Sequence, residues 1–203
     1  RSSDGGALVK AWGAATDVPV PGDYDGDGTT DVAIFRPSEG NWYVLKSSDG
    51  TYSVKAWGLG VAPYLDVPVP GDYDGDGLTD LAVFRRSTGT WLIQRSSDGQ
   101  YIIKAWGGGA DVPVVGDYDG DGKADLAIWR GATGEWYVLR SSDGGYDVTV
   151  WGAASVGDVP APGDYDGDGQ SDLAVFRPAN GTWYVQRSSD GGALVKAWGA
   201  ATD

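Results

Sequence analysis

The sequence contains no cysteine and no histidine. Without cysteine there are no disulfides and no thiolate metal sites. Without histidine the Ser-His and Cys-His nucleophile systems and the usual neutral-pH base are absent. Outside the repeated positions the only acidic residues are Asp147, Glu39 and Glu135. A glycosidase requires two carboxylates in different environments, and this nearly periodic chain offers no such pair. We therefore predict a protein that is not an enzyme.

The sequence also has little that favours a helix or a membrane span. No segment carries the apolar period of an amphipathic helix, and 34 glycines disfavour helices further. No apolar run approaches the length that crosses a bilayer, and no signal peptide is visible. The chain starts at Arg1 and contains no methionine, so we expect a mature or excised chain without its targeting segment. An all-β protein without membrane insertion is predicted.

One acidic motif is present in four copies. GDYDGDG begins at Gly22, Gly71, Gly116 and Gly163, and another aspartate follows each copy after two further residues. Carboxylates so close together repel one another unless a cation lies between them. Ca²⁺ accepts about six to eight oxygens in loose geometry, whereas Mg²⁺ demands a tight octahedron and keeps its waters. We therefore predict calcium loops, with about four Ca²⁺ ions per chain.

Each predicted loop uses its aspartates and one backbone carbonyl as metal ligands. Thr29, Leu78, Lys123 and Gln170 supply the carbonyl, and the glycines let the chain curl around the ion. The complete set of predicted ligands is Asp23, Asp25, Asp27, Thr29, Asp31, Asp72, Asp74, Asp76, Leu78, Asp80, Asp117, Asp119, Asp121, Lys123, Asp125, Asp164, Asp166, Asp168, Gln170 and Asp172.

The motif shares only its first half with an EF-hand loop. An EF-hand has a bidentate glutamate at its twelfth position and a helix on each side, whereas Ile34 stands at that position here. The flanking segments VPVP and DVAIF alternate as strands do, so the loop is predicted to join two β-strands. The alternative is four Asp-Gly turns that bind nothing, but a turn does not require four spaced carboxylates.

The formal net charge of −14 reflects the loops, which hold sixteen of the 29 acidic residues. Four bound Ca²⁺ ions would leave −6, which still disfavours a phosphate backbone, and no nucleic-acid partner is expected. Four cation sites without a sensor-type helix pair suit the millimolar calcium outside a cell. We expect an extracellular or cell-surface location.

The motifs are spaced as propeller blades are. Successive copies lie 49, 45 and 47 residues apart. Each repeat holds four strand signals, which in the first repeat are VPVPGDY, TDVAIFRPS, GNWYVLKSS and TYSVKAWG. Four short antiparallel strands make one propeller blade. We predict a single repeat domain over residues 1–203, with repeats at approximately 17–65, 66–110, 111–157 and 158–203.

The repeated core is D-x-D-G-D-G-x-x-D-[LV]-A-[VI], followed by Phe35, Phe84, Trp129 or Phe176 and then arginine. It resembles the FG-GAP/VCBS repeat family, the integrin-α-like β-propeller blades of many bacterial surface and secreted proteins. The resemblance covers the whole chain and implies that the cation loop links the first and second strands of a blade. Family members include calcium-containing lectins and adhesion modules, which implies a binding role. Closed propellers of the family usually have more blades than four.

The two ends of the chain carry the same sequence. Residues 1–17 and 187–203 both read RSSDGGALVKAWGAATD, whereas the internal repeats differ at many positions. This indicates a near-perfect larger repeat or an engineered overlap. Both copies are expected to supply the outer strand of a blade, so one is spare for pairing with another chain.

Three assemblies fit this pattern: a closed four-bladed ring, half of an eight-bladed ring made by two chains, and a slice of a longer array. We favour the second, because a four-bladed ring demands very steep blade packing. It predicts a homodimer or another self-association through the duplicated strand.

Tryptophan and arginine recur at fixed places in the repeats. A residue that recurs in every blade favours packing between blades, although a sugar could stack on such a tryptophan. The arginines are expected to form hydrogen bonds or salt bridges between blades, with a guanidinium ring for a carboxylated ligand as the alternative. The aspartates that open each Val-Pro segment are expected to form turns. These residues are Trp12, Trp57, Trp106, Trp151 and Trp198; Trp42, Trp91, Trp136 and Trp183; Arg36, Arg85, Arg130 and Arg177; and Asp17, Asp66, Asp111 and Asp158.

Two functions are compatible with these observations. The first is a calcium-stabilised, non-catalytic extracellular module that binds a carbohydrate or a protein, which the aromatic content and the family resemblance favour. The second is a structural scaffold without a ligand of its own, engineered or cut from an amplified repeat array, which the duplicated ends favour.

Overall fold

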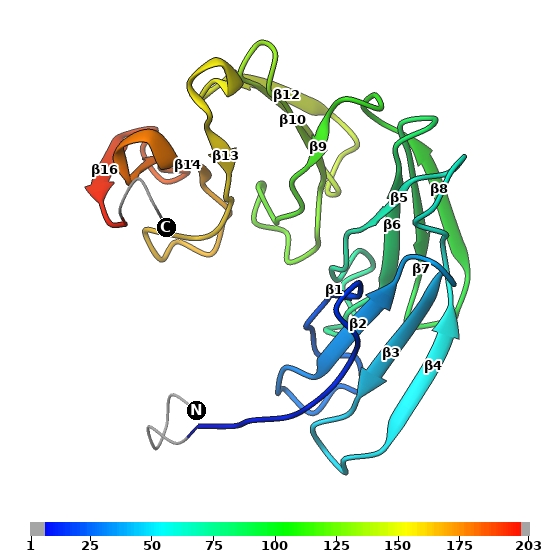
Figure 1. Cartoon of the computed structure of the whole chain (residues 1–203). Coiled ribbons are helices and arrows are strands. Elements are labelled where there is room, and N and C mark those ends of the chain that lie inside the picture. Colours follow the sequence, from blue (N-terminus) through cyan, green and yellow to red (C-terminus); the bar gives the residue numbers. More distant parts are fainter. Residues whose placement is uncertain (1–6, 200–203) are drawn as a thin grey trace.

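Figure 1 shows the computed structural model of the chain, which describes residues 7–199. These residues fold into four antiparallel sheets of four strands each. Within every sheet the strands pair in chain order, so each sheet is a meander built from one repeat. The chain is therefore an all-β protein made of four propeller blades, as the sequence predicts.

Each blade has a short inner strand and three longer strands. The bounds are β1 (Val18–Pro19), β2 (Val32–Arg36), β3 (Asn41–Leu45) and β4 (Tyr52–Ala56); β5 (Asp66–Pro68), β6 (Leu81–Arg85), β7 (Thr90–Gln94) and β8 (Tyr101–Ala105); β9 (Val112–Pro113), β10 (Leu126–Arg130), β11 (Glu135–Leu139) and β12 (Tyr146–Val150); and β13 (Val159–Pro160), β14 (Leu173–Arg177), β15 (Thr182–Gln186) and β16 (Ala193–Ala197). Two short 3-10 helices, η1 (Ala154–Val156) and η2 (Pro178–Asn180), lie in connections of the last two repeats. No helix among residues 7–199 is long and apolar enough to cross a membrane.

Aromatic pairs across the two middle strands stabilise each blade. In the first blade Phe35 lies opposite Trp42 in the β2–β3 ladder, with ring centroids 5.4 Å apart. Both side chains are fully buried. Such cross-strand pairs stabilise a sheet, and large aromatic side chains bury much apolar area. The register places the same pair in every blade, as Phe84 with Trp91, Trp129 with Trp136 and Phe176 with Trp183.

The blades also pack against one another through apolar side chains and tryptophan. Val83 of the second blade packs into the core of the first, which contains Phe35 and Trp42. The indole N–H of Trp57, at the end of the first blade, donates to the carbonyl oxygen of Leu92 in the second blade at 3.0 Å. Trp106 and Trp151 do the same at the next two junctions, to Tyr137 and Tyr184. Their predicted role in blade packing is confirmed.

The recurrent arginines act within a blade and not between blades. Arg36 donates its Nε and Nη2 hydrogens to the two carboxylate oxygens of Asp17, each at 2.9 Å, and stacks over the ring of Tyr43. The sequence prediction of an ion pair is confirmed, but its expected place between blades is wrong. Asp17 also forms the predicted turn, because its N–H donates to the Ala14 carbonyl and its Oδ2 accepts the Ala14 N–H. The other repeats form the pairs Arg85 with Asp66, Arg130 with Asp111 and Arg177 with Asp158.

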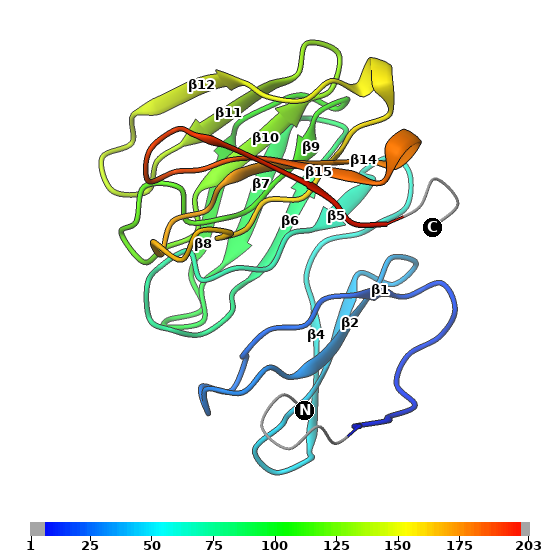
Figure 2. The ribbon, with the colours of Figure 1, turned by 90° about the vertical axis from the view of Figure 1, so that its left-hand side faces the viewer.

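The four blades follow an arc, with the β1 blade at one end and the β16 blade at the other (Figures 1 and 2). The copies of the duplicated segment differ along this arc. Ala193–Ala197 forms strand β16 against β15, whereas residues 7–11 form no strand. The expectation of an outer strand in both copies is therefore wrong for residues 7–11, which pair with no strand among residues 7–199. The remaining parts of the copies, 1–6 and 200–203, lie outside the described residues.

Candidate metal centres and pockets between blades

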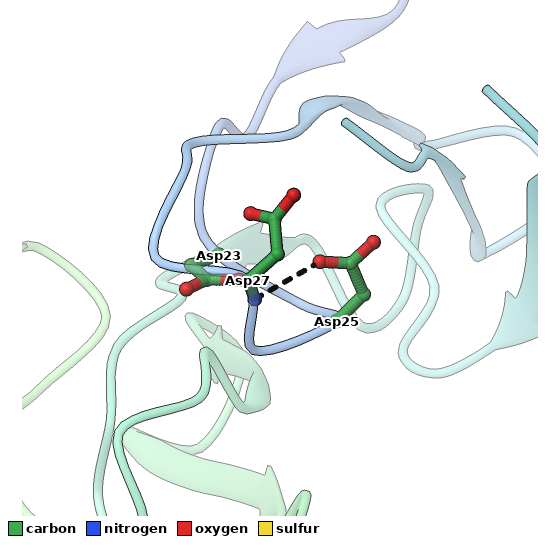
Figure 3. Close-up of side chains that lie close together, drawn as sticks. All are labelled: Asp23, Asp25 and Asp27. Atoms are coloured by element: carbon green, nitrogen blue, oxygen red, sulfur yellow. Dashed lines mark hydrogen bonds between the residues drawn. The ribbon is translucent and has the colours of Figure 1, made fainter. Parts of the chain in front are cut away.

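The aspartate motif forms a tight loop between the first two strands of each blade. Gly22 pairs with Asp31 in an isolated bridge that closes the first loop, and β1 and β2 continue from it. This is the position that the strand pattern predicts. Figure 3 shows Asp23, Asp25 and Asp27 projecting from this loop. One oxygen from each of them lies within 4.8 Å of the others, which is close enough for a single cation to contact all three.

The other three loops bring together a slightly different set of carboxylates. Their triads contain the first, second and fourth aspartates of the motif, with oxygens again within 4.8 Å. The triads are Asp72, Asp74 and Asp80; Asp117, Asp119 and Asp125; and Asp164, Asp166 and Asp172. Each loop thus places three of its four predicted aspartates together: Asp31 lies outside the first triad, and Asp76, Asp121 and Asp168 lie outside the others.

The first aspartate is held by amides of its own loop. Asp23 Oδ1 accepts the Gly26 N–H at 2.7 Å, and Asp23 Oδ2 accepts the Gly28 N–H at 2.8 Å. Gly26 and Gly28 have φ angles of 79° and 78°, in the left-handed region that side chains with a Cβ rarely adopt. The repeated glycines therefore aim two amides at one carboxylate and curl the loop around it.

The fourth aspartate and the turn after the third strand hold the loop from the other side. Buried Asp31 accepts the N–H groups of Tyr24 and Ser47 with its two oxygens, and the hydroxyl of Ser48 donates to Asp25 at 2.6 Å. The other blades repeat these contacts through Ser96 and Ser97, Ser141 and Ser142, and Ser188 and Ser189. The Ser-Ser-Asp-Gly turn therefore supports the metal loop as well as the hairpin.

The third aspartate is turned toward the backbone that follows it. Asp27 Oδ1 accepts the Thr29 N–H at 2.7 Å, and its Oδ2 accepts the Ser47 hydroxyl. The Thr29 carbonyl, predicted as a ligand, receives the same hydroxyl at 3.4 Å. The residues equivalent to Thr29 donate in the same way, as Leu78 to Asp76, Lys123 to Asp121 and Gln170 to Asp168.

The charges of the second loop fit a bound cation. Burial raises the pKa of the Asp80 carboxyl, and the nearby Asp74 carboxylate adds to this effect against opposing hydrogen bonds. Asp74 Oδ1 is buried and has no hydrogen-bond partner among the described residues. A buried carboxylate oxygen without a partner costs free energy, and a cation would remove that cost. A donor set of carboxylates suits a hard divalent cation.

Neighbouring loops are linked through their backbones. The Thr79 N–H in the second loop donates to the carbonyl oxygen of Asp23 in the first at 2.7 Å. Ala124 donates to Asp72, and Ser171 donates to Asp117, in the same way. The candidate metal centres therefore form a row in which each loop is hydrogen-bonded to the next.

Each junction between blades also contains a pocket. The pocket between the first and second blades has a volume of about 210 Å³, the next about 270 Å³ and the last about 260 Å³. All three are lined by equivalent positions of the repeat, including an arginine at the end of the third strand: Arg95, Arg140 and Arg187. The pockets are therefore repeats of one site with different side chains.

The outer two pockets are more polar than the middle one. Gln94 lines the first pocket and Gln186 the last, whereas Leu139 holds the equivalent place in the middle pocket. The side-chain carbonyl oxygens of Gln94 and Gln186 are buried and unpaired among residues 7–199, as is the Nε of Arg187. Unpaired buried polar atoms are uncommon, and they are expected where a ligand or a water completes the hydrogen bonds.

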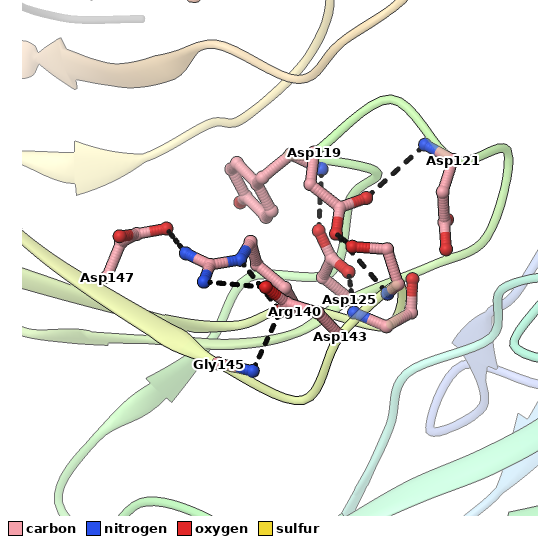
Figure 4. A network of polar contacts seen from close by, with 10 residues as sticks. Asp119, Asp121, Asp125, Arg140, Asp143, Gly145 and Asp147 are labelled. Atoms are coloured by element: carbon pink, nitrogen blue, oxygen red, sulfur yellow. Dashed lines mark hydrogen bonds and ion pairs between the residues drawn. The ribbon is translucent and has the colours of Figure 1, made fainter.

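Figure 4 shows the polar network beside the last pocket. The guanidinium of Arg140 bridges Asp143 in its own turn and Asp147 on β12. In the adjacent loop Asp125 accepts the Ser141 N–H. The candidate metal loop and the pocket wall are thus joined through the turn after β11.

Sequence reasoning did not identify the pocket residues. The signal was present, because Gln94 and Gln186 replace the leucines at positions 45 and 139 at the end of the third strand. The support of the loop by serine was equally readable from constant spacing. Asp25 and Ser48 are 23 residues apart, and the equivalent pairs keep this separation in every repeat.

A sequence model of the FG-GAP-like repeat matches residues 23–83, 72–128 and 117–175. The chain belongs to the FG-GAP-like repeat family. Each match begins at the first aspartate of a loop and extends into the next blade, so the loops are part of the family pattern. The family predicted from the residues is confirmed. No curated protein matches the chain.

The FG-GAP-like chain is also similar to solved propeller structures. One is a lectin of Agrocybe aegerita described for specific recognition of non-reducing terminal N-acetylglucosamine, at 18% identity and a TM-score of 0.52, over 91% of this chain and 67% of the lectin. Another is virginiamycin B lyase from Staphylococcus aureus, at 11% identity and a TM-score of 0.53, over 86% of this chain and 54% of the lyase. At these identities the likeness shows the fold alone.

Proposed function

We propose that this chain is a calcium-stabilised, non-catalytic module that binds carbohydrate in the pockets between its blades and works outside the cell. The observation that carries the proposal is that Gln94 in the first pocket and Gln186 and Arg187 in the last each hold a buried polar atom without a hydrogen-bond partner among residues 7–199. A polyhydroxyl ligand both donates and accepts hydrogen bonds, so it satisfies an amide oxygen and a guanidinium N–H together.

The pockets have features of carbohydrate sites. Tyr24 and Trp42 line the first pocket together with Lys55, Gln94 and Arg95, so polar groups lie beside aromatic rings. Small-ligand sites combine apolar walls with a few placed polar groups in this manner. That a similar fold in the Agrocybe aegerita lectin recognises a terminal N-acetylglucosamine supports the choice of a sugar.

Calcium has a structural role in this proposal. All the predicted aspartates, with the carbonyls of Thr29, Leu78, Lys123 and Gln170, are the proposed oxygen ligands, about four Ca²⁺ per chain. When bound, the ion neutralises the carboxylates and cross-links the loop. The chain's own serines orient those carboxylates, since Ser48 donates to Asp25. Millimolar extracellular calcium suits sites that depend on exposed carboxylates, which supports the proposed location.

The absence of histidine supports a non-catalytic role. A histidine-to-alanine variant of the lyase with the similar fold is described as catalytically inactive. The present chain has no histidine that could take an equivalent part. Its paired aspartates and arginines have structural partners, as in Arg36 with Asp17.

The test is a glycan-array screen in millimolar calcium on the wild-type chain and a variant with Gln94→Leu and Gln186→Leu. Leucine already stands at the equivalent position of the middle pocket, so the fold should tolerate the change. We expect binding to a defined sugar that falls at least tenfold in the variant. The matched control is Gln100→Leu, an exposed position outside the three pockets, which should bind as the wild type does.

A folded wild-type chain that binds no glycan in calcium would overturn the carbohydrate proposal and favour a protein ligand or a scaffold. Equal sugar binding by the wild type and the double variant would overturn the assignment of the site. Circular dichroism of each protein separates these outcomes from simple unfolding.

A further inference from the structure

Each junction between successive blades uses the same contacts. The last tryptophan of one blade donates its indole N–H to the third strand of the next, as Trp57 does to Leu92. A backbone N–H of the next loop donates back to the first aspartate of the preceding loop, as Thr79 does to Asp23. A full junction therefore requires a donor group on each of its two faces.

The fourth blade ends the arc with these groups unused. Trp198, which corresponds to Trp57, is 76% exposed. The carbonyl of Asp164, which corresponds to Asp23, accepts no hydrogen bond from any residue between 7 and 199. Tyr165 is 41% exposed, whereas the equivalent Tyr73 of the second blade is 7% exposed. The outer face of the fourth blade thus resembles an inner junction that lacks its following blade.

The first blade has the complementary groups at the opposite end of the arc. The N–H of Thr30, which corresponds to Thr79, finds no acceptor among residues 7–199. The carbonyl of Tyr43, which corresponds to Leu92, accepts the indole N–H of Trp12 at 3.4 Å. The Trp12 ring also packs edge-on against Tyr52, with centroids 5.9 Å apart. The N-terminal copy of the duplicated segment therefore covers one part of a junction and leaves another part open.

We propose that the fourth blade of one chain docks on the first blade of a second copy of this chain. In that junction Trp198 takes the place of Trp12 on Tyr43, and the Thr30 N–H donates to the Asp164 carbonyl. Residues 7–13 act as a replaceable cover that keeps the first blade closed in a single chain.

The identity of the two copies makes this exchange specific. Ala193–Ala197, Trp198 and Gly199 have the same residues as positions 7–13, so the incoming segment offers every side chain of the cover. It also arrives already paired as β16, whereas residues 7–11 have no strand partner and Val9 is 90% exposed. The docked copy adds the Asp164 carbonyl, which the cover lacks. A second copy therefore satisfies more groups than the cover does.

Such a junction is head-to-tail, because it joins different faces of the two partners. Contacts of this type generate a ring if the rotation closes and an open chain if it does not. Two chains that close the arc would form an eight-bladed ring, and successive additions would form an array.

The experiment compares Trp12→Ala with Trp198→Ala in the full-length chain by sedimentation velocity in calcium over a hundredfold range of concentration. The two variants remove the same side chain from the same local sequence. We expect Trp12→Ala to increase the associated fraction at least threefold, because the cover is loosened. Trp198→Ala should reduce it at least threefold, and the double variant should behave as Trp198→Ala does.

A second probe keeps the test independent of the stability of the variants. A fluorescent peptide with the sequence of residues 187–203 should bind Trp12→Ala more tightly than the wild type, as measured by anisotropy. The same peptide with its tryptophan changed to alanine should not bind. If both variants remain monomeric over the whole range and the peptide binds neither, the proposal is wrong.

Discussion

Two segments of this chain have identical sequences and different structures. Ala193–Ala197 is the outer strand of the fourth blade, paired along its length with β15. Residues 7–11 have the same five side chains and form no strand. Trp12 nevertheless reaches the first blade and donates to Tyr43, as the equivalent tryptophans do at the inner junctions. The tryptophan contact persists without the strand.

The difference shows which part of a blade depends on its neighbours. A strand exists only where another backbone satisfies its N–H and C=O groups, and residues 7–11 pair with no backbone strand among residues 7–199. The tryptophan needs only a carbonyl and an apolar surface, which the first blade supplies. The same five residues therefore form a strand only where a neighbouring strand is present, so tertiary contacts and not local propensity decide their conformation.

Of the changes considered, removal of calcium should have the largest effect on the stability of the protein and on the difference between the two identical segments. Each site occupied at about a hundred times its dissociation constant contributes about 2.7 kcal/mol, so the four sites together contribute about 11 kcal/mol. We expect a chelator to lower the melting temperature by tens of degrees. Because Ser188 ties the fourth loop to the turn before β16, amide protection in Ala193–Ala197 should fall to the level of residues 7–11.

The measurement is thermal unfolding by circular dichroism, with amide exchange followed by NMR, which distinguishes the two identical segments by chemical shift. Recalcification should restore both signals. An unchanged melting temperature in the chelator would contradict the calcium loops.

A change at Asp17 should have a smaller effect, confined to the N-terminal copy and the blade that holds it. The Arg36 hydrogen bonds hold the pKa of the Asp17 carboxyl below its ordinary value of 3.8. A carboxylate with a lowered folded-state pKa stabilises the protein above pH 3.8, and the stabilisation is lost as the pH falls through the lower folded value. Asp17→Asn removes this contribution and should cost about 2 kcal/mol at neutral pH, the usual scale for hydrogen bonds to charged groups.

This prediction is checked by urea unfolding of the wild type and Asp17→Asn from pH 6 to pH 2. The difference between the two curves should be constant at neutral pH and shrink below about pH 4, where the carboxylate becomes protonated. A difference that does not change with pH would show that the ion pair with Arg36 is not its source.

The change with the smallest expected effect is a glycine substitution at the same position of each copy, and it compares the two copies most directly. Val195 lies in β16 opposite Tyr184, whereas Val9 lies in the N-terminal copy with 90% of its surface exposed. Val195→Gly should cost about 1 kcal/mol, because glycine weakens a strand through its backbone entropy and lost packing. Val9→Gly should change the free energy of unfolding by only a few tenths of that amount. Urea midpoints measure both, and equal costs would mean that residues 7–11 are as ordered in solution as β16.

Much of the fold was predictable because the same strand and loop pattern recurs four times in the sequence. The aspartate spacing placed a loop between two strands, and Gly22 pairing with Asp31 closes that loop in the structure. The prediction of packing between blades is confirmed for Trp57, Trp106 and Trp151, whereas Trp42 and its equivalents pair with an aromatic side chain of their own blade. The arginines were placed at the wrong contact, because a residue that recurs in every blade can act within the blade or across it. The constant separation of 19 residues between Asp17 and Arg36 and their equivalents was the available signal.

The pockets were not predictable in the same way. Gln94 and Gln186 lie at the end of a strand, where a polar residue is usually unremarkable. They line pockets between blades, where their carbonyl oxygens are buried without partners among residues 7–199. The choice of carboxylates in each triad was also open in the sequence, because four aspartates at regular spacing are equivalent until the loop closes.

The sequence by itself determined the number of blades, the strand order within each blade and the place of the aspartate loops. These features depend on short-range patterns: turns, alternation and the spacing of like residues. The tertiary structure decided which of two identical segments becomes a strand, which arginine pairs with which aspartate and where polar atoms lie unpaired between blades. The first two outcomes depend on partners elsewhere in the same blade, and the third depends on the packing of one blade against the next, so none of them follows from a short stretch of sequence.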